Sequence, residues 1–338
     1  MTDHRTLYLC TDHALYRARP GDDGRWRAEG LALAGLGGVR SLLVDPLDPR
    51  RWWAATADSG VLVTEDEGIA WRECNQGIDR RAGWCLARHP RTGELWYGAE
   101  PAALFRSADA GESWSACGDV DGLTATPAAG PSPAPGSGEC RVRHVSTSSG
   151  NVVLAAVEEG WLLRSQDGGA TWAGVRDGLD RDCHAITLRP GKPDVVLAST
   201  GGGVYRSEDA GLTFAPSSEG MHHGHTTRVL LHPDRPEVAY VAAAECEPAA
   251  SAHRPQGAGG ACYRSEDGGR TWRRLTGGLP EVMRPAPISV AGDAGDPDSF
   301  YVGTTDGSVW LSEDGGESFR IAVEGIQGWV RHLLVVRR

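Results

Sequence analysis

Short apolar runs separated by turn residues dominate the chain, and one stretch shows the pattern clearly. Val39–Val44 is an apolar run, and two prolines at positions 46 and 49 place a turn directly after it. Further short runs follow at Trp52–Thr56, Gly60–Thr64 and Ala70–Cys74. No stretch keeps a 3.6-residue apolar period over ten or more residues, so the pattern predicts strands and few helices.

An acidic turn recurs along the chain and connects the third and fourth of these predicted strands. It reads Ser/Thr-x-Asp-x-Gly-x-Ser/Thr/Ala followed by Trp or Phe, and a worn copy spans Pro20–Trp26. The six complete copies contain Asp66, Asp109, Asp167, Asp209, Asp267 and Asp314. Repeats of about 40–50 residues with four short strands each indicate a β-propeller.

The two ends of the sequence predict how such a ring closes. The first repeat has only three strands, near Leu7–Cys10, Leu15–Arg19 and Arg25–Glu29, and its missing innermost strand matches Trp329–Val336. Pairing these terminal segments in one blade removes open sheet edges. We therefore predict an all-β fold, a single seven-bladed propeller over residues 1–338, with loop insertions at about 116–139 and 245–261.

The acidic turn resembles the Asp-box, or BNR repeat, of sialidases, xyloglucan-cleaving glycosidases, sortilin-type receptors and photosystem assembly factors. Ser165–Trp172 and Ser265–Trp272 match its pattern fully, and the resemblance covers essentially the whole chain. It implies the propeller fold but no single activity, because such propellers serve unrelated functions. In each copy the aspartate is expected to accept hydrogen bonds from the turn, as a structural residue.

Composition narrows the choice of partner and compartment. A net charge of −11 argues against a nucleic-acid partner and against an acidic membrane surface, because both favour basic proteins. The first residues lack the apolar stretch of a secretory signal, so we expect a cytoplasmic protein. Its eight cysteines form no CxxC pair; Cys246 and Cys262 bracket the second insertion, and a disulfide between them is left open.

When the predicted inner strands of the repeats are aligned with one another, three of them have an arginine at the same position. These are Arg40, Arg143 and Arg331. They are expected at the central opening, on the face away from the acidic turns. Trp84, His184 and Arg228 take equivalent or adjacent positions. Guanidinium groups bind carboxylate or phosphate in bidentate fashion, so the pattern favours an anion site. The alternative is pairing with carboxylates expected on the same face, namely Asp12, Asp58, Glu100, Glu158, Glu159, Glu245 and Asp306.

A histidine cluster leads into the sixth inner strand. His222, His223 and His225 lie within four residues and could bind a divalent metal, with His144, His184 or His332 arriving from other blades. The spacing matches no known metal motif, so clustered surface histidines are the alternative interpretation.

Two classes of function remain. The sequence departs from sialidases, because it lacks their Arg-Ile-Pro segment and an identifiable Tyr–Glu nucleophile pair. Asp12 resembles the first catalytic aspartate of xyloglucan-cleaving glycosidases, but those enzymes take a second carboxylate from another propeller. We therefore predict a ligand-binding propeller with an arginine- and histidine-lined pocket for a small anionic or carbohydrate-like molecule, with metal-assisted lyase or hydrolase chemistry left open. The alternative is a non-catalytic protein-interaction or assembly-factor propeller.

Overall fold

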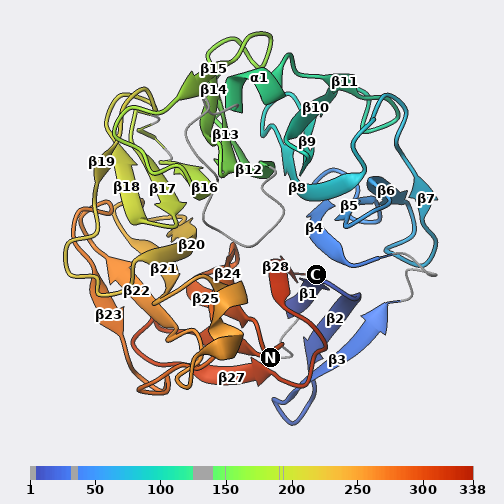
Figure 1. Cartoon of the computed structure of the whole chain (residues 1–338). Helices are drawn as coiled ribbons and strands as arrows, with labels where there is room; N and C mark the ends of the chain where they lie inside the picture. Colours follow the sequence, from blue (N-terminus) through green and yellow to red (C-terminus); the bar gives the residue numbers. More distant parts are fainter. Residues whose placement is uncertain are drawn as a thin grey trace. The chain divides into compact units, whose positions relative to one another are not determined.

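The computed structural model is all-β, with a seven-bladed propeller arrangement (Figure 1). It describes residues 5–337 except 32–36, 125–139, 149, 190 and 193. Within these residues, seven four-stranded antiparallel sheets form the blades. The chain divides into two compact units: unit 1 is Met1–Leu42, Gly201–Val204 and Ser217–Arg338, and unit 2 is Leu43–Thr200 and Tyr205–Pro216. The single-domain assignment stays a prediction.

Unit 1 contains three whole blades. Their strands, each blade given from its inner to its outer strand, are β28 (Val330–Arg337), β1 (Arg5–Thr11), β2 (Leu15–Pro20) and β3 (Trp26–Leu31); β20 (His225–Leu231), β21 (Ala239–Ala244), β22 (Ala261–Ser265) and β23 (Arg273–Leu275); and β24 (Pro287–Asp293), β25 (Asp296–Thr304), β26 (Val309–Ser312) and β27 (Arg320–Val323).

Four blades lie wholly or mostly in unit 2. Their strands, in the same order, are β4 (Val39–Val44), β5 (Trp52–Thr56), β6 (Val61–Thr64) and β7 (Arg72–Glu73); β8 (Ala82–Arg88), β9 (Leu95–Glu100), β10 (Ala103–Ser107) and β11 (Ser115–Ala116); β12 (Arg141–Thr147), β13 (Val153–Glu158), β14 (Trp161–Ser165) and β15 (Ala173–Val175); and β16 (Cys183–Leu188), β17 (Val196–Thr200), β18 (Gly203–Ser207) and β19 (Ala215–Pro216).

The first blade of the sequence closes through both ends of the chain, as predicted. Strand β28 pairs antiparallel with β1, in a register that runs from Arg5 opposite Arg337 to Thr11 opposite Val330. All seven residues of β1 are buried. The C-terminal strand thus supplies the inner position that the N-terminal repeat lacks (Figure 1).

Apolar side chains fill the space between neighbouring blades. In unit 2, Trp96 and Leu104 of one blade pack with Val145, Val157 and Leu163 of the next. The middle strands are apolar along nearly their whole length because both of their faces are covered. Burial of this apolar surface is the main force that holds each pair of blades together.

Six acidic turns repeat nearly the same hydrogen bonds. In the copy of Asp167, the carboxylate accepts the Ser165 hydroxyl at 2.8 Å, the Thr171 N–H at 2.9 Å and the Thr171 hydroxyl at 2.6 Å. The Ser165 hydroxyl oxygen in turn accepts the Gly169 N–H. Gly169 has a φ of +88°, and a Cβ there would lie 2.1 Å from Trp96, so only glycine fits.

Short helices occur within both insertions that the sequence predicts as loops. The first contains α1 (Val120–Thr124), and the rest of that insertion, 125–139, lies outside the described residues. The second contains the 3-10 helix η1 (Pro248–His253) and bonds through Gly260 N–H to Met283 O, just before β24.

Candidate functional site

Each blade has two ends, and the predicted site residues gather at the end away from the acidic turns. Because successive strands are antiparallel, this far end holds the starts of the inner strands and the turns between second and third strands. In unit 2 the far end contains Trp84 in β8, Arg143 in β12 and His184 in β16. The structure brings these three predicted residues into one charged network.

Two arginines from β12 stack on the indole ring of Trp84. The Cζ atoms of Arg141 and Arg143 lie 4.9 Å and 5.4 Å from the ring centroid, within the range of cation–π attraction. The ring is fixed from its edge, because its Nε1–H donates to Glu100 Oε2 at 2.8 Å. Arg143 is the extra residue of a β-bulge in β12, because Val142 and His144 have successive partners on β13.

Glu158, at the end of β13, sits between the two guanidinium groups. Its carboxylate oxygens lie 3.0 Å from Arg141 Nε and 3.0 Å from Arg143 Nη1. Burial alone raises the pKa of Glu158, but Arg143, His184 and Arg141 together hold that pKa below its usual value. The carboxylate is therefore ionised at neutral pH, which suits an ion pair and not a proton donor.

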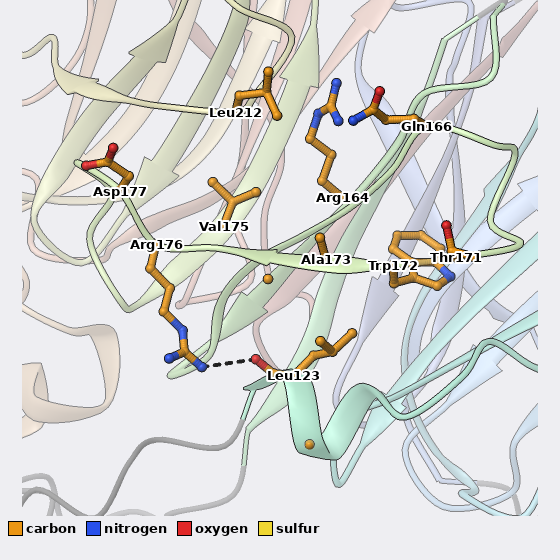
Figure 2. Close-up of a pocket in the computed structure, with 12 residues that line it drawn as sticks. Leu123, Arg164, Gln166, Thr171, Trp172, Ala173, Val175, Arg176, Asp177 and Leu212 are labelled. Atoms are coloured by element: carbon orange, nitrogen blue, oxygen red, sulfur yellow. Dashed lines mark hydrogen bonds between the residues drawn. The ribbon is translucent and has the colours of Figure 1, made fainter.

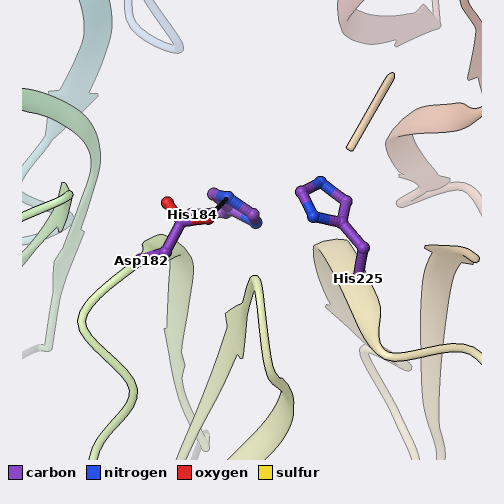
Figure 3. Close-up of side chains that lie close together, drawn as sticks. All are labelled: Asp182, His184 and His225. Atoms are coloured by element: carbon purple, nitrogen blue, oxygen red, sulfur yellow. Dashed lines mark ion pairs between the residues drawn. The ribbon is translucent and has the colours of Figure 1, made fainter. Parts of the chain in front are cut away.

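His184 extends the network through an acidic neighbour. Its Nε2 lies 3.1 Å from Asp182 Oδ2, and only 1% of its side chain is exposed (Figure 3). Burial lowers the pKa of His184, but the hydrogen bond and charge of Asp182 outweigh burial, and the pKa is raised. The pair therefore favours the imidazolium form, which carries a positive charge close to Glu158.

Trp161 has an unusual backbone conformation beside this network. Its φ is +65°, in a region that bulky residues rarely adopt. Two other repeats have a glycine at positive φ in this position, Gly60 and Gly203, and the rest have small residues, Ala103, Ala261 and Ser308. The indole lies between Arg176 and Arg181, whose Cζ atoms are 4.8 Å and 5.7 Å from its centroid. Backbone strain of this kind tends to be retained at binding sites.

In unit 1 the predicted arginines lie on separate strands of the far end. Arg331, in β28, pairs through Nε with the carboxylate of Asp12, and its Cζ is 4.8 Å from the Trp329 ring centroid. Arg40 lies half-buried in β4 and Arg228 half-buried in β20. Arg143 and Arg331 thus each have a carboxylate partner within their own unit, the alternative that the sequence left open.

His332, next to Arg331, is part of the packed interior. Its Nδ1 accepts the Leu42 N–H at 3.2 Å, and burial, aided by the charge of Arg228, lowers its pKa to about 3. A neutral ring that accepts a backbone hydrogen bond is structural.

The three histidines proposed for a metal diverge in role. His223 Nδ1 lies 2.5 Å from the Tyr263 hydroxyl, and that hydroxyl also accepts the His222 N–H. Burial, with Arg274, lowers the pKa of His223. His225 is buried at the start of β20. Across the described residues, these three do not form a group with ligand atoms within 4.8 Å of one another.

Sequence reasoning missed Arg141, Asp182 and Trp161. The alignment of the inner strands compared a single position in each strand. Arg141 lies two residues before that position, so the alignment did not include it. Trp161 carried a readable signal, because it is the one large residue at a position where the other five repeats have Gly60, Ala103, Gly203, Ala261 and Ser308. The eight cysteines, all within the described residues, are free, so Cys246 and Cys262 are not bonded. No helix among the described residues is long and apolar enough to cross a membrane.

Comparison with known proteins supports the fold and leaves the family open. No protein-family model matches this sequence, and no curated protein matches it. Solved structures do match: an ancestral GH74 enzyme has 16% identity and a TM-score of 0.63 over 88% of this chain and 38% of its own. The GH74 xyloglucanase from Xanthomonas campestris has 18% identity and a TM-score of 0.61, over 90% and 46%.

A third match differs in how much of it is covered. YCF48 bound to D1 peptide has 16% identity and a TM-score of 0.57, over 91% of this chain and 89% of its own. This chain therefore spans less than half of the two GH74 structures but most of YCF48. At these identities the likeness shows the propeller fold alone.

Proposed function

We propose that this chain is an Asp-box propeller that acts in the cytoplasm as a non-catalytic binding module for a protein or peptide. The observation that carries the proposal is the pairing of Arg143 with Glu158 and of Arg331 with Asp12. A guanidinium that is already paired with a carboxylate of the protein is less available to bind a small anionic ligand. These arginines then act as rigid parts of a surface.

The surface around Trp161 suits a peptide. Arg176 and Arg181 flank the half-buried indole, and interface energy concentrates in Trp, Tyr and Arg side chains held rigidly. YCF48, which has the propeller fold and most of whose length this chain covers, is bound to the D1 peptide in its structure. The likeness adds support by analogy only.

The enzyme alternative finds less support in the same residues. Glycosidases need one carboxylic acid that holds a proton and a second carboxylate nearby. Glu158 has a lowered pKa and is bound by two arginines, and Asp12 is bound by Arg331. Sialidase or xyloglucanase chemistry would have to displace these pairs. The small-anion pocket and the metal site at His222, His223 and His225 stay predictions.

A random peptide library displayed on phage tests the proposal. We expect selected peptides to bind the full chain, and Trp161→Gly to weaken binding about tenfold, the loss typical of an interface tryptophan. Gly60 and Gly203 occupy the same position in two other repeats at positive φ, so glycine suits this backbone, and circular dichroism checks that the variant is folded. Ile69→Ser is the control, because Ile69 is 84% exposed in an acidic turn.

Two results would refute the proposal. One is selected peptides that bind Trp161→Gly as tightly as the unaltered chain. The other is turnover of xyloglucan or of a sialoside by the purified protein, with loss of turnover in Glu158→Gln or Asp12→Asn.

A further inference from the structure

Four repeats place an arginine directly before the hydroxyl residue of the acidic turn. They are Arg106, Arg164, Arg206 and Arg264. Three of them have a carboxylate partner: Glu94 for Arg106, Glu208 for Arg206, and Glu266 for Arg264, the last at 2.9 Å. Two also reach the next blade, where Arg106 donates to Gly168 O and Arg264 to Gly315 O. The arginine–carboxylate pair is thus a repeated feature of the fold.

Arg164 keeps the backbone contact of this pattern but lacks the carboxylate. Its Nε–H donates to Ala210 O at 2.8 Å. Two residues later stands Gln166, where two of the other three repeats have Glu208 and Glu266 and the third has Ala108. Among the described residues no carboxylate lies within 4.0 Å of the Arg164 guanidinium, and its two Nη groups have no hydrogen-bond partner.

Only 7% of the Arg164 residue is exposed, and its two Nη atoms keep some contact with solvent. Burial lowers the pKa of Arg164, and the charge of Asp209 offsets this effect only in part. A guanidinium is a planar donor that matches a carboxylate in geometry and in charge. Burial without a partner is costly, so an anion that reached Arg164 would be bound favourably.

A cavity of about 760 Å³ adjoins Arg164 along the outer strand β15. Gln166 and Trp172 line it from the acidic turn, Leu212 from the next blade and Leu123 from α1 (Figure 2). Figure 2 shows the Arg164 guanidinium beside the Gln166 amide. The cavity lies within the volume range of pockets that bind small molecules.

The walls of the cavity show which ligand fits. Arg176 donates through Nη2 to Leu123 O at 3.1 Å, which joins α1 to the end of β15 (Figure 2). Trp172, Val175 and Leu212 offer apolar surface. Asp177 lines the cavity and the charge of Asp209 acts on Arg164, so a singly charged anion is favoured over a dianionic phosphate.

We propose that this pocket binds a carboxylate attached to an apolar body, with Arg164 as the group that binds the anion and Trp172 and Leu212 in contact with the apolar part. The carboxylate could belong to a free small acid or to an acidic side chain of a protein segment. The pocket shares Arg176 with the surface around Trp161. Its anion-binding group is Arg164, which takes no part in the proposed peptide surface, so the proposal does not depend on peptide binding at Trp161.

Isothermal titration of the full chain with phenylacetate and with its neutral amide, phenylacetamide, tests the pocket. We expect phenylacetate to bind with a Kd of about 1 mM or tighter, and at least about tenfold more tightly than the amide. Affinity should fall with added sodium chloride, because the pocket is open to solvent. Equal affinity for the acid and the amide would overturn the proposal.

Two variants of this chain distinguish binding in this pocket from nonspecific binding elsewhere on the protein. Gln166→Glu provides the carboxylate that Arg206 and Arg264 already have, so it should raise the Tm and weaken phenylacetate binding about tenfold. Arg164→Gln should remove the preference for the acid over the amide. Unchanged phenylacetate affinity in folded Gln166→Glu would contradict the role of Arg164.

The source of the carboxylate is distinguished with a blocked peptide, Ac-Gly-Glu-Phe-Gly-NH2, and its Glu→Gln counterpart. Binding of the acidic peptide alone assigns the pocket to a protein segment, and binding of phenylacetate alone assigns it to a small acid. If neither carboxylate shows saturable binding that depends on Arg164, the proposal is wrong.

Discussion

The acidic turns and the far ends of the blades follow opposite rules. The turns of Asp109, Asp167 and Asp209 repeat one set of hydrogen bonds. At the far ends the inner strands carry different side chains at the same position, such as Trp84, Arg143 and His184. At the far end of one blade Trp161 takes a position that small residues hold in the other repeats, and Glu158 beside it pairs with two arginines. Contacts that recur from blade to blade are therefore those that the fold requires. A residue that departs from the repeat indicates a position where one blade has a separate role, such as binding.

The departures extend to the acidic turns themselves. Gln166 replaces the glutamate that pairs with Arg206 or Arg264 in other repeats, and a cavity lies beside it. Both proposed binding regions therefore coincide with a break in the repeat. This comparison leads to three further predictions about how differently the two ends respond to change.

The largest effect is expected at the far end, from Glu158→Gln. The change leaves Arg141 and Arg143 without their shared carboxylate in a half-buried site, and loss of one partner of such a pair costs about 3 kcal/mol of unfolding free energy. Urea unfolding measures it. The control is Glu29→Gln, because Glu29 pairs with Arg17 on an exposed edge, where an ion pair contributes about 0–1 kcal/mol. Equal losses would mean that the Glu158 network is ordinary surface pairing.

A smaller loss is expected from Asp267→Ala in an acidic turn. The carboxylate accepts N–H groups from Arg270 at 2.9 Å and Thr271 at 3.0 Å, which would lose their partner. We expect a loss of about 1–3 kcal/mol in unfolding free energy, with peptide affinity unchanged. Asp22→Ala in the worn copy is the control, since Asp22 is exposed. Peptide binding lost in folded Asp267→Ala would contradict the separation of the two ends.

The smallest effects concern pH, where the two ends should respond with opposite sign. Hydrogen bonds from the turn, working against burial, lower the pKa of Asp209 to about 2, so its stabilisation is present above about pH 4 and is lost as pH falls toward 2. The raised pKa of His184 gives stabilisation that is complete below about pH 6.5 and is lost as pH rises through the folded value.

Unfolding free energies measured across the pH range check this pair of signs. His184→Gln should remove the loss on the alkaline side and leave the acid side unchanged, and Asp209→Asn should do the reverse. A variant that changes both sides equally would show that the two ends are coupled.

The sequence predicted the fold closely because the fold rests on local, repeated signals. The strand Val39–Val44 and the closure of β1 by β28 appear in the structure as expected. The site was harder, because it depends on which side chains meet across blades. The position shared by the inner-strand arginines predicted Arg143. Its pairing with Glu158, however, depends on which residue of β13 lies beside it, and the sequence alone does not show that. The missing partner of Arg164 was visible in the sequence only once the other arginines were known to be paired.

The antiparallel pairing of β1 with β28 has a mechanical consequence. Arg5 and Arg337 are opposite each other at one end of this ladder, so a force that pulls the two ends of the chain apart acts on that pair first. The remaining pairs would then open one after another toward Thr11 and Val330, as in a zipper, and not all at once as in shear. Stretched by its ends, the protein should open at this blade under a low force, and an internal pair of attachment points should make it markedly more resistant.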